Sequence, residues 1–132
     1  MKIALQLSLT AALWGLFNLA WAADTTPAKE LERYSAQAAQ APSAARGELF
    51  FKARHGGDWS CSTCHGVPPI EAGKHTVTGK SIAALAPQAN PKAFTDSARV
   101  EKWFRRNCKD VLSRECTAIE KSDVLAYLIQ LK

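Results

Sequence analysis

The chain has 132 residues and a formal net charge of +5, from 17 basic and 12 acidic side chains. This length suits one domain and leaves little room for a second. The charge is too mild to indicate a nucleic-acid-binding protein, and no platform of aromatic and basic residues accompanies it. It does permit an acidic protein partner.

Residues 1–22 have the pattern of a cleaved signal peptide. Lys2 gives a positive start, residues 3–19 are mostly apolar, and Ala-Trp-Ala at 20–22 fits the small-x-small cleavage pattern. The alternative is an uncleaved membrane anchor, but four polar residues interrupt the apolar run: Gln6, Ser8, Thr10 and Asn18. We therefore expect an exported, periplasmic domain over 23–132. No stable membrane insertion is expected, because no other stretch approaches the roughly 20 apolar residues that span a bilayer.

Two helices are expected at the start of this domain. Thr26 can cap the first, Pro27 suits its first position, and Ala-Pro at 41–42 ends it. Ser43 can cap a second helix that runs to about Arg54. Its apolar side would consist of Leu49, Phe50 and Ala53.

The sequence Cys61-Ser-Thr-Cys64-His65 follows directly and is the attachment pattern of c-type haem. Two thiols three residues apart can form thioethers with the two vinyl groups of a porphyrin, and the adjacent histidine can bind the iron as proximal ligand. A thioredoxin-like reading would need a βαβ pattern, which is absent. A zinc site would need a second pair with similar spacing, whereas Cys108 and Cys116 are eight apart. The pattern therefore predicts one covalent haem c.

The remainder of the domain is expected to hold a long loop and two more helices. Residues 66–91 read as an ordered loop around a haem edge, with one helical turn near 82–85. Thr95 can cap a helix over 96–107, and the capping box at 117–120 opens the last helix. The third helix has an apolar stripe at i, i+3, i+4 and i+7: Val100, Trp103, Phe104 and Asn107.

Packing between these helices gives the expected fold class. No strand alternation is convincing, so the domain should be all-α, with a class I cytochrome c-like fold around the haem. The helix carrying Gly47 and Phe50 is expected to cross the last helix near Tyr127, where the small residue allows close approach.

Cys108 and Cys116 are predicted to form a disulfide, because both lie in an exported domain and their separation allows it. The bond would join the end of one helix to the start of the last and stabilise the fold by about 2–3 kcal/mol. Two free thiols are the alternative.

The second axial ligand of the iron cannot be methionine, because the only methionine is Met1, which leaves with the signal peptide. His55, His75, a lysine, Asn107 or no residue at all remain candidates. Either histidine would give bis-histidine iron and a plain electron carrier. Asn107 lies on an apolar stripe, where an amide without a partner costs about 1–3 kcal/mol. It can bind the iron, or it can simply cap the end of its helix.

Several stretches resemble the SHP (sphaeroides haem protein) group of cytochromes c. They are NPKAFTDSARVEKWFRRNC at 90–108, the haem motif at 61–65, Thr-Gly-Lys at 78–80 and Leu-Ala-Pro at 85–87, with Cys-Thr at 116–117 and Glu-Lys at 120–121. The similarity covers essentially all of the domain after the leader, and no motif position departs from the pattern.

The resemblance implies an asparagine amide as sixth ligand, here Asn107, and a disulfide that begins at the next residue. It also implies binding of oxygen or nitric oxide at the iron, and electron exchange with a dihaem cytochrome c. Asn107 would then be both an iron ligand and the functional residue at the open site. Enzymatic redox chemistry on these molecules and simple ligand binding both fit this reading.

A gated iron is our hypothesis for such a site. An amide oxygen is a weak-field donor, so reduction should free the sixth position for a diatomic ligand. A basic stripe lies beside the proposed ligand: Lys102, Arg105, Arg106 and Lys109. It is either an ordinary solvated face or a docking site for an acidic redox partner.

Overall fold

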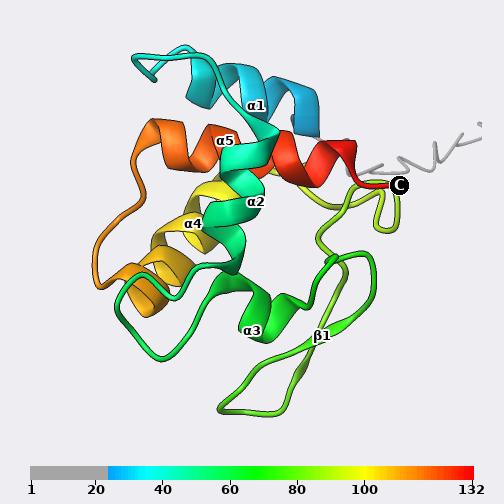
Figure 1. Cartoon of the computed structure of the whole chain (residues 1–132). Helices are drawn as coiled ribbons and strands as arrows, with labels where there is room; N and C mark the ends of the chain where they lie inside the picture. Colours follow the sequence, from blue (N-terminus) through cyan, green and yellow to red (C-terminus); the bar gives the residue numbers. More distant parts are fainter. Residues whose placement is uncertain (1–23) are drawn as a thin grey trace, which may run out of the picture.

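A computed structural model of the chain describes residues 24–132, so the predicted signal peptide and its cleavage site lie outside the described residues. This part contains five helices and one short pair of strands (Figure 1). The elements are α1 (Pro27–Ser35), α2 (Ala44–Lys52), α3 (Cys61–His65), β1 (Gly73–Lys74), β2 (Ser81–Ile82), α4 (Ser97–Leu112) and α5 (Ala118–Gln130). No helix within 24–132 is long and apolar enough to cross a bilayer. The predicted all-α class is confirmed.

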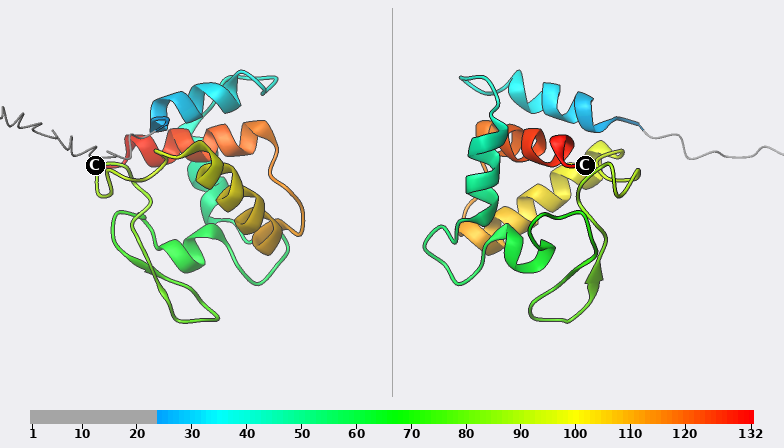
Figure 2. Two further views of the ribbon diagram at one scale, coloured as in Figure 1. Left: turned by 180° about the vertical axis from the view of Figure 1, so that it is seen from behind. Right: turned by 45° about the vertical axis from the view of Figure 1, so that its right-hand side comes forward.

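The first two helices begin at the predicted caps. The hydroxyl of Thr26 accepts the Lys29 N–H at 3.2 Å, and that of Ser43 accepts the Arg46 N–H at 3.3 Å. Helix α1 already ends at Ser35, so the prediction that it continues to the Ala-Pro pair is wrong. It lies beside α5 at one end of the molecule, while the segment with β1 and β2 lies at the other end (Figure 2).

Helices α2 and α5 cross at Gly47. A Cβ atom there would collide with the carbonyl of Asp123, so only glycine permits this approach. The crossing thus lies one turn before Tyr127, close to its predicted position. Phe51, one turn after Gly47, is 1% exposed and its ring centroid lies 5.6 Å from that of Tyr127.

The apolar side predicted for α2 is wrong in part. Leu49 is 71% exposed, and Phe51 rather than Phe50 is the fully buried aromatic residue of the helix. Gly47 contacts α5, which is distant in sequence, and this contact sets which side of α2 faces the core. Two clusters form the core: Phe51, Val124, Tyr127 and Leu128, and Tyr34, Val100 and Leu125.

Helix α4 differs from its prediction at both ends. Its cap is Asp96 and not Thr95, because the Asp96 carboxylate accepts the Arg99 N–H at 2.8 Å. The helix continues to Leu112 and ends where Ser113 adopts left-handed backbone, with φ of 58°. Asn107 therefore lies in the helix interior. The interpretation of Asn107 as a helix cap is wrong.

The long loop contains a strand pair instead of the predicted helical turn. Gly73 pairs with Ile82 and Lys74 with Ser81 in antiparallel register. A Cβ at Gly73 would collide with the Cys64 carbonyl, so β1 packs directly on α3.

The predicted capping box of the last helix is confirmed. The Thr117 hydroxyl accepts the Glu120 N–H, and the Glu120 carboxylate accepts the Thr117 N–H at 2.8 Å.

Candidate haem site

The Cys-x-x-Cys-His sequence forms the short helix α3. Ser60 caps it by accepting the Thr63 N–H at 3.2 Å, and the Thr63 hydroxyl accepts the Ser60 N–H at 2.9 Å. Gly66, with φ of 75°, follows as the residue that ends the helix. The helical spacing places Cys61 and Cys64 almost one turn apart, as two attachment points to one flat molecule require.

Burial controls the chemistry of these side chains. It raises the pKa of the Cys61 thiol to about 11, so the thiol is neutral at ordinary pH. Burial lowers the pKa of His65, which favours the neutral imidazole that binds metals. The buried Nδ1 of His65 has no hydrogen-bond partner among the described residues. The described residues therefore do not hold this imidazole through Nδ1, which is compatible with a role as metal ligand.

The core cluster that Cys61 of α3 packs against has further partly buried members, which suits a large apolar cofactor. Leu85, Phe94 and Phe104 are only partly buried where they pack against the core. Trp103 on α4 remains 47% exposed. Such side chains usually lose more contact with water in a domain of this size, so a bound porphyrin would complete their burial. The residues present therefore fit a haem attached at α3.

The zinc interpretation finds no support in the structure. Cys108 and Cys116 form a disulfide, with their Cα atoms 5.6 Å apart, as predicted. Their sulfur atoms are thus not free to join Cys61 and Cys64. Within residues 24–132 no three His, Cys, Asp or Glu side chains gather at a possible metal site.

Asn107 lies on α4 directly before the disulfide-bonded Cys108. Its side chain is partly buried, and no hydrogen bond of its amide occurs within residues 24–132. The apolar residues Val100 and Phe104, two turns and one turn earlier, pack into the core around Leu125. The half-buried amide is thus beside an apolar face and has no protein partner in the described structure, so it is free to bind a ligand or a metal.

The two candidate histidines are engaged locally. The Nε2 atom of His55 donates to the carbonyl of Phe50 at 2.8 Å, and the two rings lie 4.3 Å apart between centroids. The Nδ1 atom of His75 accepts the N–H groups of Val77 and Thr78 at 3.2 and 3.3 Å. Each imidazole thus stabilises its own turn through one ring nitrogen.

The basic stripe of α4 is exposed in full: Lys102, Arg105, Arg106 and Lys109. None of these side chains forms an ion pair with another residue in the described part of the chain. The Arg106 guanidinium lies 5.2 Å from the ring centroid of Trp103. The stripe therefore adjoins the exposed tryptophan.

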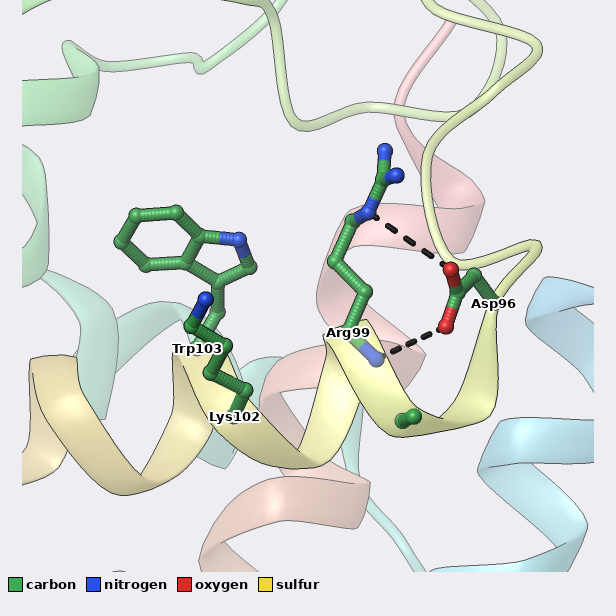
Figure 3. A pocket seen from close by; sticks show the side chains of 5 residues that line it. Asp96, Arg99, Lys102 and Trp103 are labelled. Atoms are coloured by element: carbon green, nitrogen blue, oxygen red, sulfur yellow. Dashed lines mark hydrogen bonds and ion pairs between the residues drawn. The ribbon is translucent and has the colours of Figure 1, made fainter.

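One feature beside this site was missed in the sequence. A pocket on α4 is lined by Asp96, Ala98, Arg99, Lys102 and Trp103. Arg99 and Trp103 point into it on the same side of the helix (Figure 3). The spacing of Arg99, Trp103 and Asn107 by four residues was the available signal.

The all-α fold and the haem motif on α3 define a monohaem cytochrome c. The chain is 51% identical over 113 residues to the cytochrome c-type protein SHP of Cereibacter sphaeroides, which covers 83% of this chain and 87% of that protein. The chain therefore belongs to the SHP family of cytochromes c, and its cofactor is one haem c.

Other comparisons agree with this assignment. Residues 37–128 match a family model described as a domain of unknown function, DUF1924. Cytochrome c″ of Methylophilus methylotrophus is 42% identical over 94 residues, or 68% of this chain and 65% of that protein. The structure of oxidised SHP, described as an oxygen-binding cytochrome c, matches with a TM-score of 0.74 and 50% identity over 80% of this chain and 96% of that one. Oxidised cytochrome c″ matches with a TM-score of 0.70 and 37% identity over 80% and 94%.

Proposed function

We propose that this chain is a periplasmic ligand-binding cytochrome with a labile sixth iron ligand. Cys61 and Cys64 form the thioethers to the haem, His65 binds its iron on one side, and Asn107 binds on the other. With haem bound, Asn107 would give up the iron to small diatomic molecules, oxygen or nitric oxide, once the iron is reduced.

The unpartnered amide of Asn107 is the observation that carries this proposal. It lies in the interior of α4 beside an apolar face, and no hydrogen bond within residues 24–132 explains it. His55 and His75 each use one ring nitrogen to hold a local turn, so only the second nitrogen of each ring would be left for iron. Methionine occurs only at residue 1.

The lability follows from the chemistry of the amide. Bound haem supplies an iron that changes oxidation state and accepts axial ligands. The oxygen of Asn107 is a hard, weak-field donor, which holds ferric iron modestly and ferrous iron poorly. After reduction the side chain stays near the site, because α4 is fixed by the core and by the disulfide at Cys108. Its amide N–H can then donate a hydrogen bond to the incoming molecule.

Two relatives support this proposal by analogy. SHP is described as an oxygen-binding cytochrome c. The solution structure of cytochrome c″, with a TM-score of 0.68 and 36% identity, is described as giving insight into haem-ligand detachment. The proposal for Asn107 combines both properties: the axial ligand leaves the iron, and a small molecule then binds there.

Electron exchange is the second part of the proposed function. The exposed, unpaired charges of the basic stripe suit an acidic redox protein, and a dihaem cytochrome c is the partner that the family resemblance suggests. Export through the signal peptide at residues 1–22 would place both proteins in the periplasm, where haem c is attached.

Replacing Asn107 tests the proposed ligation. Asn107→Ala should retain covalent haem but change the ferric visible spectrum, because the sixth position becomes vacant or takes water. Arg105→Ala, on the same helix but outside the pocket, is the matched control and should keep the wild-type spectrum. If Asn107→Ala also keeps the wild-type spectrum, Asn107 is not a ligand. His55→Ala and His75→Ala would then identify a bis-histidine electron carrier.

A further inference from the structure

The pocket beside Trp103 has an arginine directed into it. Asp96, Ala98, Arg99, Lys102 and Trp103 line it. The side chains of Arg99 and Trp103 leave α4 in the same direction, and the loop that precedes the helix borders the space on one side (Figure 3). A cation and a half-exposed aromatic ring therefore share one wall.

The guanidinium of Arg99 has little to hold it within the described residues. Its Nε lies 3.7 Å from the Asp96 carboxylate, which is longer than a hydrogen bond, and the Arg99 side chain is 64% exposed. By contrast, Arg33, Arg46 and Arg114 each donate to a carboxylate at 2.6 to 3.1 Å. An arginine can bind a carboxylate through two parallel N–H groups, and Arg99 has these donors free in the described structure.

The position of Arg99 along α4 matches one edge of a haem. Arg99 precedes Asn107 by eight residues, which is about 12 Å along a helix axis. Trp103 lies halfway between them along the helix, and its side chain is 47% exposed. The thioethers join the vinyl-bearing edge of the porphyrin to α3, whereas the two propionates project from the pyrroles at the other edge. These carboxylates need cationic or hydrogen-bonding partners wherever they leave water.

We propose that Arg99 binds a haem propionate, with Asp96 keeping the guanidinium turned toward the pocket. Asp96 is itself fixed as the cap of α4, since it accepts the Arg99 N–H at 2.8 Å. Lys102, on the pocket rim, adds positive charge to the same edge. The inference rests on the proposed function, because haem attachment at Cys61 and Cys64 holds the cofactor and ligation by Asn107 sets where its edge lies along α4.

A paired propionate has consequences that can be measured on the iron. The positive charge of Arg99 offsets the carboxylate, and reduced iron carries one positive charge fewer than oxidised iron. Removing Arg99 leaves an uncompensated negative charge beside the haem, which favours the oxidised state. The midpoint potential should therefore fall. It should also become more dependent on pH, because an unpaired propionate is protonated more readily than a paired one.

Resonance Raman spectra of the holoprotein test this contact directly. The propionate bending band should shift in Arg99→Gln, shift less in Arg99→Lys, and stay unchanged in Arg105→Gln, which removes the same charge outside the pocket. The midpoint potential should fall more in Arg99→Gln than in Arg105→Gln. A band in Arg99→Gln identical to that of the wild type, or equal shifts in Arg99→Gln and Arg105→Gln, would overturn the proposal.

A pyridine haemochrome assay distinguishes a failure of haem attachment from a failure of the Arg99 contact. It reports whether the haem is joined through two thioethers, which tests Cys61 and Cys64 and not Arg99. If Arg99→Gln yields no holoprotein, Arg99→Lys carries the test, since it retains the charge and loses the paired donors. A wild-type propionate band in Arg99→Lys would then count against the proposal, and a shifted band would support it.

Discussion

The two sides of α4 differ in how their polar groups are satisfied. On the side toward α1 and α5, Glu101 accepts a hydrogen bond from the Tyr34 hydroxyl at 2.7 Å and another from the Lys121 ammonium at 2.8 Å. On the other side, the side chains of Arg99 and Asn107 donate or accept no hydrogen bond within the described residues. On the first side, other protein residues satisfy the polar side chains. On the second side, the polar side chains are left for a cofactor.

The same contrast extends to the start of α4. Glu30 of α1 is 1% exposed and accepts hydrogen bonds from Arg33 and from the hydroxyl of Ser97, both at 2.6 Å. Helix α1 is thus linked to α4 through the buried carboxylate of Glu30 and the partly exposed carboxylate of Glu101. A helix anchored so firmly on one side can present Asn107 at a constant position on the other. A weak ligand that leaves and returns needs such a support.

Removing haem attachment should have the largest effect on stability, because it takes the cofactor away from its side of α4. The double change Cys61→Ala with Cys64→Ala should lose covalent haem. Its free energy of unfolding should fall by about 5 kcal/mol. Without haem, roughly 200 Å² of apolar protein surface becomes exposed to water, and burial of such surface contributes about 25 cal/mol/Å². Urea unfolding and haem retention in acidic acetone measure both effects. Ser62→Ala, between the two cysteines, should retain the haem. A double variant as stable as the wild type would show that the haem does not complete this core.

Breaking the opposite side should destabilise the protein without changing the haem. Glu101→Gln leaves the ammonium of Lys121, which is 8% exposed, without its carboxylate. The cost should be about 1–2 kcal/mol, because the Glu101 side chain is 41% exposed and water screens part of the loss. The visible spectrum should stay unchanged. Glu48→Gln, in an exposed pair with Lys52, is the control and should barely affect stability. A changed spectrum with unchanged stability in Glu101→Gln would reverse the roles assigned to the two sides.

Acid should reduce this contribution of Glu101. Burial alone would raise the pKa of Glu101, but hydrogen bonds from Lys121 and Tyr34 and nearby positive charge outweigh burial and lower it. The folded state therefore binds this proton less tightly than the unfolded state. The contribution is present above the ordinary glutamate pKa of about 4.3 and is lost as pH falls through the lowered value. The stability difference between wild type and Glu101→Gln should shrink as pH falls below about 4. A difference that stays constant down to the lowest pH at which both fold would contradict this account.

Loss of the disulfide should also destabilise the protein without removing the haem. Cys108→Ser with Cys116→Ser should cost about 2–3 kcal/mol, because the bond closes a loop of about nine residues. Covalent haem should be retained, since Cys61 and Cys64 are unchanged. Urea unfolding of the wild type with and without a thiol reductant gives an independent measure. Equal stability under both conditions would mean that the bond contributes nothing.

The basic stripe should affect partner binding more than folding. Lys102→Gln with Arg105→Gln should slow electron transfer to an acidic redox protein by about tenfold at low salt, and the difference should vanish at high salt. Stability should change by less than about 0.5 kcal/mol. Lys29→Gln with Lys92→Gln removes the same charge elsewhere on the surface. Equal slowing by both double variants would assign the effect to net charge and not to the stripe.

Local signals allowed much of the fold to be predicted. The haem motif, the caps at Thr26 and Ser43 and the capping box at Thr117 depend on neighbouring residues, and each was predicted from its spacing. The disulfide was predicted because only two cysteines remained outside the motif. Asn107 was singled out because an amide on an apolar stripe is unusual, although its role as a ligand stays a prediction.

The features that were missed depend on contacts distant in sequence. The buried side of α2 is set by the approach of Gly47 to α5, so the choice of Phe51 over Phe50 has no local signature. The network around Glu101 joins residues up to 67 positions apart. The true end of α4 depends on Ser113 adopting left-handed backbone, which serine does less readily than glycine or asparagine. These contacts become visible only in three dimensions.

Visible spectra of the purified holoprotein, ferric and ferrous, before and after carbon monoxide, test the central claim most directly. A labile ligand at Asn107 predicts a high-spin or nearly high-spin iron that takes up carbon monoxide immediately once reduced. Low-spin bands in both oxidation states, unchanged by carbon monoxide, would contradict the claim. They would mean two strong axial ligands and an electron carrier that uses His55 or His75.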